Sequence, residues 1–323
     1  MNRVELQSVD PPPGGSVMSV NGAVEPADLG FTLVHEHVMS TFGADPARYP
    51  SYDTDRLLKQ VLPYLAKLKK LGCQTLVDCT AAYFGRHPEL LRRISQESGL
   101  HILTNTGYYG AANDRYVPPH AYHETAEQIA GRWTREWCES IDGTGIFPGF
   151  IKTAVDGGPL SEIDRKLLIA AAITHLQTGL TIHTHTGDNI EAAHSIMSIL
   201  LAEGVSPQAW IWVHASNVTD VQPLLHAAGK GAWISLDGVC EEHAQSILGL
   251  AQVLKEHGYL DQVLLSHDGD AYSGEGDFRP FDYLFTGFIP QLKTNGFSDT
   301  EIHQITVQNP RRAFTVKIRK YMR

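Results

Sequence analysis

Short apolar segments of β-type composition alternate with helical patterns along almost the whole chain of 323 residues. Eight apolar segments are each followed by a helical pattern at the spacing of a βα unit. They end at His35, Asp78, Thr104, Lys152, His183, His214, Leu236 and Ser266. Eight such units predict an α/β fold of the (β/α)8 TIM-barrel type. No glycine-rich dinucleotide fingerprint follows any of the eight segments, which argues against an open doubly wound sheet.

The beginning of the chain sets the domain boundaries. Residues 1–15 contain three consecutive prolines and two glycines, and we expect a flexible N-terminal lead-in there. In Val17–Val24, an Asn-Gly pair separates two short β-type pieces, which predicts a β-hairpin before the barrel. Single barrels reach this length once loops are added. Residues 16–323 are therefore expected to form one domain, a barrel with a short N-terminal hairpin.

Three further segments carry definite expectations. Tyr122–Ile141 has the spacing of one long amphipathic helix. The run Gly269–Pro290 is long and mixed in composition, which predicts a loop over the mouth of the barrel. A closing helix is expected near Asp299–Phe314.

The charge and cysteine content narrow the possible partners. The formal net charge is -10, without a run of like charges, so nucleic acid and anionic membranes are poor candidates. The four cysteines lack a metal-type spacing and fit a reducing cytoplasm as free thiols. No early segment has the pattern of a signal peptide, and no apolar run is long enough to span a bilayer. These features predict a cytoplasmic protein.

The first barrel segment, Gly30–Val38 (GFTLVHEHV), ends in two histidines one residue apart. Residues i and i+2 of a strand point to the same face, so His35 and His37 can present their imidazoles side by side. Two imidazoles at the carboxyl end of a strand suit one transition-metal ion. A pair of merely packed or exposed histidines is the alternative.

The other barrel segments supply further polar residues at the same end. Chemistry in a (β/α)8 barrel takes place at the carboxyl ends of the strands. Those ends carry His35, His37, Lys152, His183, His214 and, just past the eighth segment, Asp268. A single histidine at a strand end is more often a hydrogen-bonded structural residue than a ligand. Six polar residues at one end of one barrel predict a common site.

Lys152 ends the apolar run that begins at Phe147, where an uncompensated ammonium group would be expensive to bury. A neutral amine at this position can react with carbon dioxide to form a carbamate, whose two oxygens can bridge two cations. His35, His37 and Asp268 would then bind one ion, and His183 and His214 the other, with a hydroxide between them. A lysine paired with a carboxylate, or a mononuclear deaminase-type site, are the alternatives.

Several segments together resemble the phosphotriesterase family of the amidohydrolase superfamily. The matching segments are Gly30–Val38, Phe150–Lys152, Thr181–Thr184, Val213–His214, Leu265–Asp268 and Asn309–Arg312. The resemblance implies a binuclear site, usually of zinc, with a carboxylated lysine at Lys152. It also implies that Asp268 binds a metal and takes the proton from the attacking hydroxide.

Three residues are candidates for substrate contacts. Tyr109 lies where members of the resembling family place an aromatic residue near the metals, and it could polarise the substrate or form an apolar wall. His185 lies two residues past His183 on the same strand face and could contact the substrate or support a ligand. Arg279, in the last loop, could meet an anionic substrate or remain solvated. Glu36 is expected to be structural.

One position departs from the family members that open acyl-homoserine lactones. Those members resemble one another in an arginine after a Leu-Asp pair, whereas Gly238 follows Leu236 and Asp237 in this chain. The active-site wall should therefore differ on that side, which argues against quorum-signal lactones.

The function predicted by the resemblance is that of a binuclear metal-dependent hydrolase. The expected reaction is the opening of a small lactone, with sugar-derived and phosphorylated lactones both open, by a metal-bridging hydroxide. The alternatives are an amide hydrolase of a small N-acyl compound, a phosphotriesterase, and a non-catalytic binding protein. The expected cofactors are two divalent ions, Zn²⁺ before Mn²⁺, Co²⁺ or Fe²⁺, and the carbamate on Lys152. A small-molecule substrate and a homodimer are the expected partners.

Overall fold

The computed structural model describes residues 14–42, 52–186, 190–274 and 277–321. Within these residues, parallel strands form a closed barrel with eight strand positions. The third and eighth positions are each divided into two short strands. The strands are β3 (Thr32–His37), β4 (Thr75–Asp78), β5 (His101–Leu103), β6 (Asn105–Thr106), β7 (Phe150–Ala154), β8 (Thr181–His185), β9 (Trp210–Val213), β10 (Trp233–Leu236), β11 (Val263–Leu265) and β12 (Gly269–Asp270). The (β/α)8 barrel predicted from the sequence is confirmed.

The two divided strands join the two halves of the barrel. One half has the order β12-β3-β4-β5 and the other β11-β10-β9-β8-β7-β6. The third position is interrupted at Thr104, between β5 and β6, and the eighth at residues 266–268, between β11 and β12. The second interruption leaves Asp268 between β11 and β12 at the carboxyl end of the barrel, where its backbone N–H donates a hydrogen bond to the His35 carbonyl oxygen.

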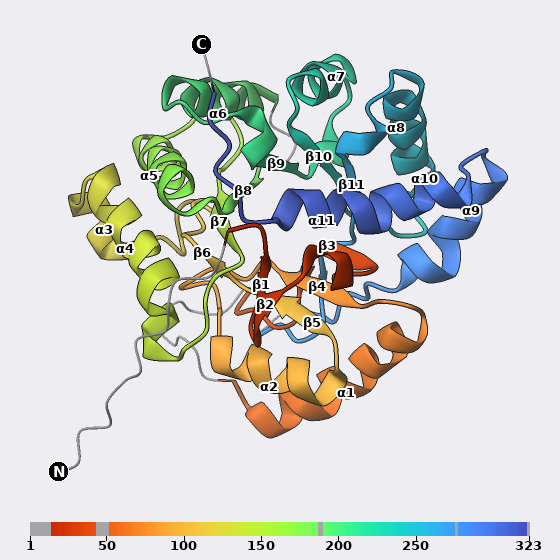
Figure 1. The fold of residues 1–323 in the computed structure, drawn as a ribbon, viewed down its shortest axis with the longest axis horizontal. Coiled ribbons are helices and arrows are strands. Elements are labelled where there is room, and N and C mark those ends of the chain that lie inside the picture. The colour runs from red at the N-terminus through yellow and green to blue at the C-terminus, as the bar shows by residue number, and fades with distance from the viewer. Residues whose placement is uncertain (1–13, 43–51, 187–189, 275–276, 322–323) are drawn as a thin grey trace.

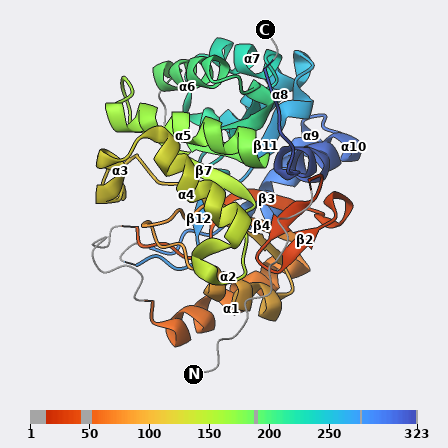
Figure 2. The same ribbon diagram turned by 60° about the vertical axis from the view of Figure 1, so that its left-hand side comes forward.

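Helices surround the strands on the outside, as Figures 1 and 2 show. Their apolar sides pack on the outward-facing strand residues in one large core. The helices are α1 (Thr54–Lys70), α2 (Pro88–Ser98), α3 (Pro119–His123), α4 (Ala126–Glu139), α5 (Glu162–Thr178), α6 (Ile190–Ala202), α7 (Gln222–Gly229), α8 (Ala244–Glu256), α9 (Ile289–Thr294), α10 (Asp299–His303) and α11 (Asn309–Phe314). None of the helices in the described part of the chain is long and apolar enough to cross a membrane.

The hairpin and the last helix cover the amino end of the barrel. Strands β1 (Val17–Ser19) and β2 (Gly22–Val24) pair in antiparallel fashion, so the predicted hairpin is confirmed. Val17 and Phe314 belong to the same buried cluster as Phe150, which faces the barrel interior. Figure 1 shows the hairpin and α11 lying over this end. A catalytic site is therefore expected at the opposite, carboxyl end of the barrel. Residues 1–13, most of the predicted lead-in, lie outside the described residues.

The prediction of one helix over Tyr122–Ile141 is wrong. Helix α3 ends at His123, and α4 begins at Ala126. Thr125 between them accepts a hydrogen bond from the backbone of Gln128, whose side chain accepts one from the backbone of Thr125. This capping box satisfies the first backbone donors of a new helix. The apolar spacing that predicted a single helix therefore runs across a break between two helices.

The segment Gly269–Pro290 is only partly a loop. It contains β12, a π-helical turn at Leu284–Phe288 and the beginning of α9. The predicted closing helix is present, because α10, a π-helical turn at Gln304–Gln308 and α11 follow one another directly.

Candidate metal centre

All six predicted ligands meet at the carboxyl end of the barrel. The histidines and the lysine are nearly or completely buried, whereas about a quarter of the Asp268 side chain is exposed. They come from the end of β3 (His35, His37), from β7 (Lys152) and β8 (His183), and from the residues after β9 (His214) and β11 (Asp268). The expectation that the carboxyl ends of all strands lie on one face of the barrel therefore brought all six residues together.

A β-bulge in β3 directs its two histidines inward. Leu33 pairs with Leu76 and Glu36 with Asp78, so β3 has one residue more than β4 between these pairs. The extra residue lets Val34 join the buried cluster in the lower part of the interior while His35 still points toward the carboxyl-end site. His37 follows on the same side.

Asp268 and Lys152 connect the imidazoles into one group. The Oδ1 atom of Asp268 lies 3.4 Å from Nε2 of His35 and 3.4 Å from Nε2 of His37. The Nζ atom of Lys152 lies 3.3 Å from Nε2 of His35 and 3.1 Å from Nδ1 of His183. Donor atoms of His35, His214 and Asp268 all lie within 4.8 Å of one another. His35 is therefore the common neighbour of every part of the group.

Backbone strain accompanies two members of the group. His214 and Asp268 both have positive φ angles, of 59° and 55°. This left-handed conformation is costly for residues with a Cβ and persists only where the surroundings impose it. At Asp268 the surroundings are the Glu36 carboxylate, which accepts hydrogen bonds from the backbone N–H groups of His267 and Gly269 on either side. His214 directly follows β9, and Asp268 lies between β11 and β12.

Lys152 is the most unusual member of the group. Its side chain is completely buried, and it forms no ion pair within the described part of the chain. Burial lowers the pKa of its amino group. The loop after β6 approaches its backbone closely, because a Cβ on Gly107 would lie 2.0 Å from the Lys152 carbonyl oxygen. The alternative of a lysine that reaches the surface and pairs with a carboxylate does not fit these contacts.

Burial favours the neutral form of three imidazoles at the site. Burial lowers the pKa of His35, His183 and His185 well below the usual histidine value. For Asp268, burial acts in the opposite direction, but the nearby imidazoles, His35 first, outweigh it and hold the pKa well below its usual range. Neutral imidazole and ionised carboxylate are the protonation states in which these groups bind metal ions.

Neighbouring polar groups orient the β3 histidines. Nδ1 of His37 lies 2.8 Å from Oγ1 of Thr80, whose hydroxyl donates to the Met39 carbonyl oxygen. The hydroxyl must therefore accept from Nδ1, which leaves the lone pair of His37 on Nε2, facing Asp268. Nδ1 of His35 lies 3.3 Å from Oδ2 of Asp237. Such outer partners commonly orient the histidines that bind metals.

Sequence reasoning missed Asp237 and Thr80. Asp237 is buried, follows β10 directly and accepts hydrogen bonds from the backbone of His214 and from the Ser235 hydroxyl. Its position at a strand end was a usable signal, because the same rule selected the six ligands. Thr80 gave no signal, because a threonine past the end of β4 is ordinary and its contact with His37 depends on strand pairing.

The three candidates for substrate contacts also border the group. The hydroxyl of Tyr109 lies 3.3 Å from Nδ1 of His185, and the His185 ring packs edge-on against His214. Burial raises the pKa of Tyr109, so its hydroxyl keeps its proton at neutral pH. Arg279 pairs with Asp270 through the backbone, and its Nη1 lies 3.7 Å from Oδ2 of Asp268. The structure thus brings Tyr109, His185 and Arg279 to the cluster.

The donor set fits divalent metal ions. It combines four imidazoles, one carboxylate and one buried amine, and ligand atoms of His35, His214 and Asp268 lie within 4.8 Å of one another. Imidazole and carboxylate donors are typical of zinc and related ions. Nδ1 of His35, although close to Asp237, has no hydrogen bond to any described residue, and a cation at Nε2 would strengthen its attraction to that carboxylate.

The fold and the cluster define a class, the (β/α)8 barrels with histidine and aspartate ligands at the carboxyl ends of their strands. A model of the phosphotriesterase family matches residues 15–314, and the chain belongs to this family. It is therefore a hydrolase of the phosphotriesterase type.

Several relatives match over nearly the whole chain. The phosphotriesterase homology protein of Mycobacterium tuberculosis is 30% identical over 92% of this chain and 96% of its own. The human N-acetyltaurine hydrolase is 25% identical over 94% of this chain and 99% of its own. A solved structure from the engineering of organophosphate hydrolysis activity in a weak promiscuous lactonase template is 28% identical. It covers 93% of this chain and 99% of its own, with a TM-score of 0.83.

Proposed function

We propose that the protein is a binuclear metal-dependent hydrolase that opens a small lactone. The proposal depends most on one observation, the completely buried Lys152 between the imidazoles of His35 and His183. Two ions at the cluster, with Zn²⁺ as the expected metal, would supply a Lewis acid for the carbonyl oxygen and lower the pKa of water. His35, His37 and Asp268 would hold one ion, and His183 and His214 the other.

Lys152 would hold both ions as a carbamate. Its buried amine has a lowered pKa, which favours the neutral form that attacks carbon dioxide. In this step a N–C bond forms and the nitrogen loses one proton. The product has two oxygens that share a negative charge. That charge offsets part of the positive charge of two ions in a site where Asp268 is the only carboxylate among the proposed ligands.

Asp268 is proposed as the proton acceptor. A water oxygen bonds to the lactone carbonyl carbon and its proton passes to the Asp268 carboxylate; the ring C–O bond then breaks, and the leaving alkoxide takes that proton to give a hydroxy acid. The exposed quarter of the Asp268 side chain faces the space a substrate would occupy. Tyr109 and His185 would orient the carbonyl group, and Arg279 would attract substrates with an added negative charge.

The wall at Gly238 favours small lactones. A Cβ at this position would meet only Nδ1 of His243, at 3.7 Å, and the chain lacks here the arginine of the family members that open acyl-homoserine lactones. The solved structure derived from a lactonase template also supports a lactone substrate. Simple, sugar-derived and phosphorylated lactones fit this proposal better than acyl-homoserine lactones.

An amide hydrolase is the second candidate. It is favoured by the human relative, an N-acetyltaurine hydrolase that this chain matches over 94% of its length. Attack on an amide carbonyl needs the same metals and the same proton acceptor, but an amide anion leaves less readily than an alkoxide, so the nitrogen must gain its proton before or as the C–N bond breaks. Phosphotriester hydrolysis is proposed only as a side activity.

A paired screen tests the proposal. The purified protein, expressed with added zinc, would be assayed for acid release from a panel of lactones, N-acyl amino compounds and one phosphotriester. We expect the highest kcat/KM with a small lactone and about two metal ions per chain by mass spectrometry. Higher kcat/KM with an N-acyl compound would favour the amidase, whereas one ion per chain would contradict the binuclear site. Two ions without turnover of any substrate would favour a binding protein.

A further inference from the structure

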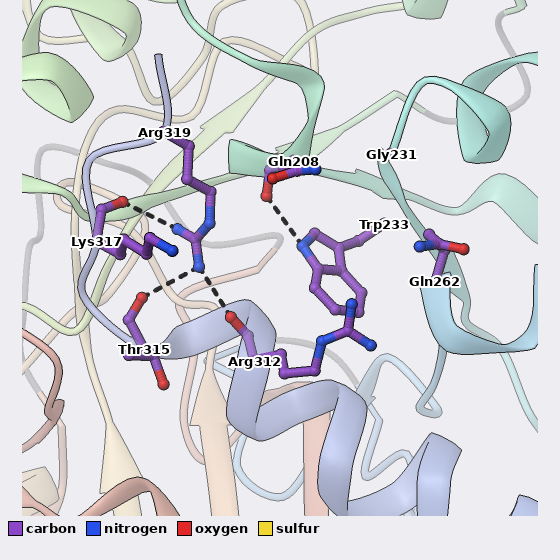
Figure 3. A pocket seen from close by; sticks show the side chains of 8 residues that line it. All are labelled: Gln208, Gly231, Trp233, Gln262, Arg312, Thr315, Lys317 and Arg319. Carbon is purple, nitrogen blue, oxygen red and sulfur yellow. Dashed lines mark hydrogen bonds between the residues drawn. The ribbon is translucent and has the colours of Figure 1, made fainter. Parts of the chain in front are cut away.

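A second polar cavity lies at the amino end of the barrel, on the face opposite the metal centre. It has a volume of about 340 Å³. We call it the amino-end pocket. Its lining residues come from the segments just before β9, β10 and β11, from α11 and from the C-terminal segment: Gln208, Gly231, Trp233, Gln262, Arg312, Thr315, Lys317 and Arg319. Figure 3 shows Lys317 and Arg319 on one side of the Trp233 indole and Gln262 on the other.

The pocket is basic in an acidic protein. The chain has a formal net charge of -10, yet its last 22 residues contain six basic side chains and no acidic one. Three of the six, Arg312, Lys317 and Arg319, line the pocket. One carboxylate lies near them, since Oδ2 of Asp261 is 3.8 Å from Nη1 of Arg312. Three positive charges against one negative charge leave a local excess of about two positive charges.

Arg319 has no compensating anion. Its guanidinium donates hydrogen bonds to the carbonyl oxygens of Arg312, Thr315 and Lys317 and to the Thr181 hydroxyl. All these acceptors are neutral, and Arg319 forms no ion pair with any described residue. Burial, followed by the charge of Arg312, lowers the pKa of Arg319 to about 10. A largely buried cation beside a second cation is costly unless an anion joins them.

Other donors remain open to a ligand. The guanidinium of Arg312 lies over the Trp233 ring, at 5.2 Å from its centroid, and is half exposed. The exposed Lys317 forms no ion pair or side-chain hydrogen bond within the described residues. The amide groups of Gln208 and Gln262 border the same space (Figure 3). Arginine and lysine donors of this kind are well suited to phosphate oxygens.

We propose that the amino-end pocket binds a phosphate group, carried by a small phosphorylated metabolite or free in solution. A phosphate monoester has nearly two negative charges at neutral pH, which matches the local excess of two positive charges. The volume lies at the lower end of the range for small-molecule pockets. Arg312 and Lys317 would contact the phosphate oxygens, and Arg319 would contribute its charge from behind. The site is independent of the function proposed for the metal centre.

The test is a titration of the zinc-loaded protein with glycerol 3-phosphate, with inorganic phosphate and with glycerol, by calorimetry at constant ionic strength. We expect both phosphates to bind with dissociation constants below about 1 mM and glycerol not to bind. Binding of the ester tighter than that of inorganic phosphate identifies a phosphorylated metabolite as the ligand. Equal binding identifies the phosphate group alone.

Variants separate this pocket from the metal centre, which could also bind phosphate. Lys317→Gln and Arg312→Gln should each weaken binding about tenfold, whereas Lys320→Gln, on the same exposed segment but outside the pocket, should change it less than twofold. Unfolding curves of the three variants check that the fold is retained, and Lys317→Gln should be the most benign. Unchanged affinity in Lys317→Gln and Arg312→Gln, or no binding below about 10 mM in the parent protein, would overturn the proposal.

Discussion

The two ends of the barrel both gather nitrogen-containing side chains, but with opposite electrical character. At the carboxyl end, burial lowers the pKa of His35, His183 and Lys152, so their nitrogens tend to be neutral and can donate lone pairs. At the amino end, the nitrogens of Arg312, Lys317 and Arg319 carry protons and positive charge. The first set suits a cation and the second an anion.

The difference shows how far burial and residue type decide what a nitrogen can bind. A histidine or lysine responds to burial by losing its proton, whereas an arginine keeps its charge even when it is largely buried. Both ends belong to one barrel. What each end can bind depends on its side chains, which come from the strand ends at the metal centre and largely from the C-terminal segment at the amino-end pocket.

The largest expected effect is that of Lys152→Ala. The variant removes the group proposed to hold both ions, so we expect activity to fall by a factor of about 10³ or more and the metal content to fall below one ion per chain. Activity assays and mass spectrometry of the metal content measure the two effects. Lys59→Ala, an exposed lysine on α1, is the control and should match the parent protein. Full activity and two ions per chain in Lys152→Ala would show that Lys152 does not hold the metal ions. The proposed contrast between a cation site and an anion site would then lose its main support.

Asp268→Asn is expected to have the next largest effect. The amide keeps the shape but cannot accept the proton, so kcat should fall about 10²- to 10³-fold with a smaller change in KM. Steady-state kinetics over a range of pH would detect the loss of the proton acceptor. Asp299→Asn, a matched change at an exposed position in α10, should leave kcat unchanged. A variant with the parent kcat would show that another group accepts the proton.

His175 allows a test of burial at the amino end. Its Nδ1 lies 2.8 Å from the Leu180 carbonyl oxygen, and its Nε2 accepts a hydrogen bond from the backbone of Arg319. Burial lowers its pKa to about 4. Above about pH 6.5 the imidazole is neutral in both states, and between about pH 6.5 and 4 only the unfolded chain binds the proton. Stability should therefore fall with acidification over this window, by about 3 kcal/mol from this residue.

Urea unfolding at several pH values measures the His175 effect. The variant His175→Gln should be less stable at pH 8 but should lose less stability than the parent protein between pH 6.5 and pH 4. Parallel losses in both proteins would mean that the imidazole is not held neutral by its surroundings.

Glu36→Gln is expected to have the smallest effect. The carboxylate accepts hydrogen bonds from the Ser266 hydroxyl and from the backbone of His267 and Gly269, and its Oε1 lies 2.7 Å from Nδ1 of His267. An amide replaces one acceptor with a donor, so the free energy of unfolding should fall by about 2 kcal/mol.

Urea unfolding measures the Glu36 effect, with Glu97→Gln as the exposed control that should change stability by less than about 0.5 kcal/mol. Equal stability of the two variants would show that the Glu36 carboxylate does not hold the eighth strand.

Much of the fold followed from residues close together in the sequence. Apolar segments and their polar ends predicted the eight barrel positions and brought His35, Lys152 and Asp268 to one face. The break at Thr125 that the prediction missed is also local. The sequence contains the Thr125–Gln128 capping box that starts the second helix, but the continuous apolar spacing favoured one helix.

The remaining features depend on pairing between distant segments. The bulge in β3 exists only relative to β4, and the partners of His35 and His37 come from other strands, through Asp237 and Thr80. The left-handed backbone at Asp268 depends on Glu36, 232 positions earlier. One sequence shows which residues occur near a strand end but not which atoms meet across the barrel.

The bond between Glu36 and the backbone of Gly269 spans 233 positions of the chain. Contacts of such separation form late, because the intervening segment must first lose much of its conformational freedom. During synthesis the histidines of β3 emerge long before Asp268, so the group of six cannot assemble until Asp268 has left the ribosome. Binding of metal ions should therefore indicate that folding is complete. A chain truncated before Asp268 should carry the β3 histidines without a complete site.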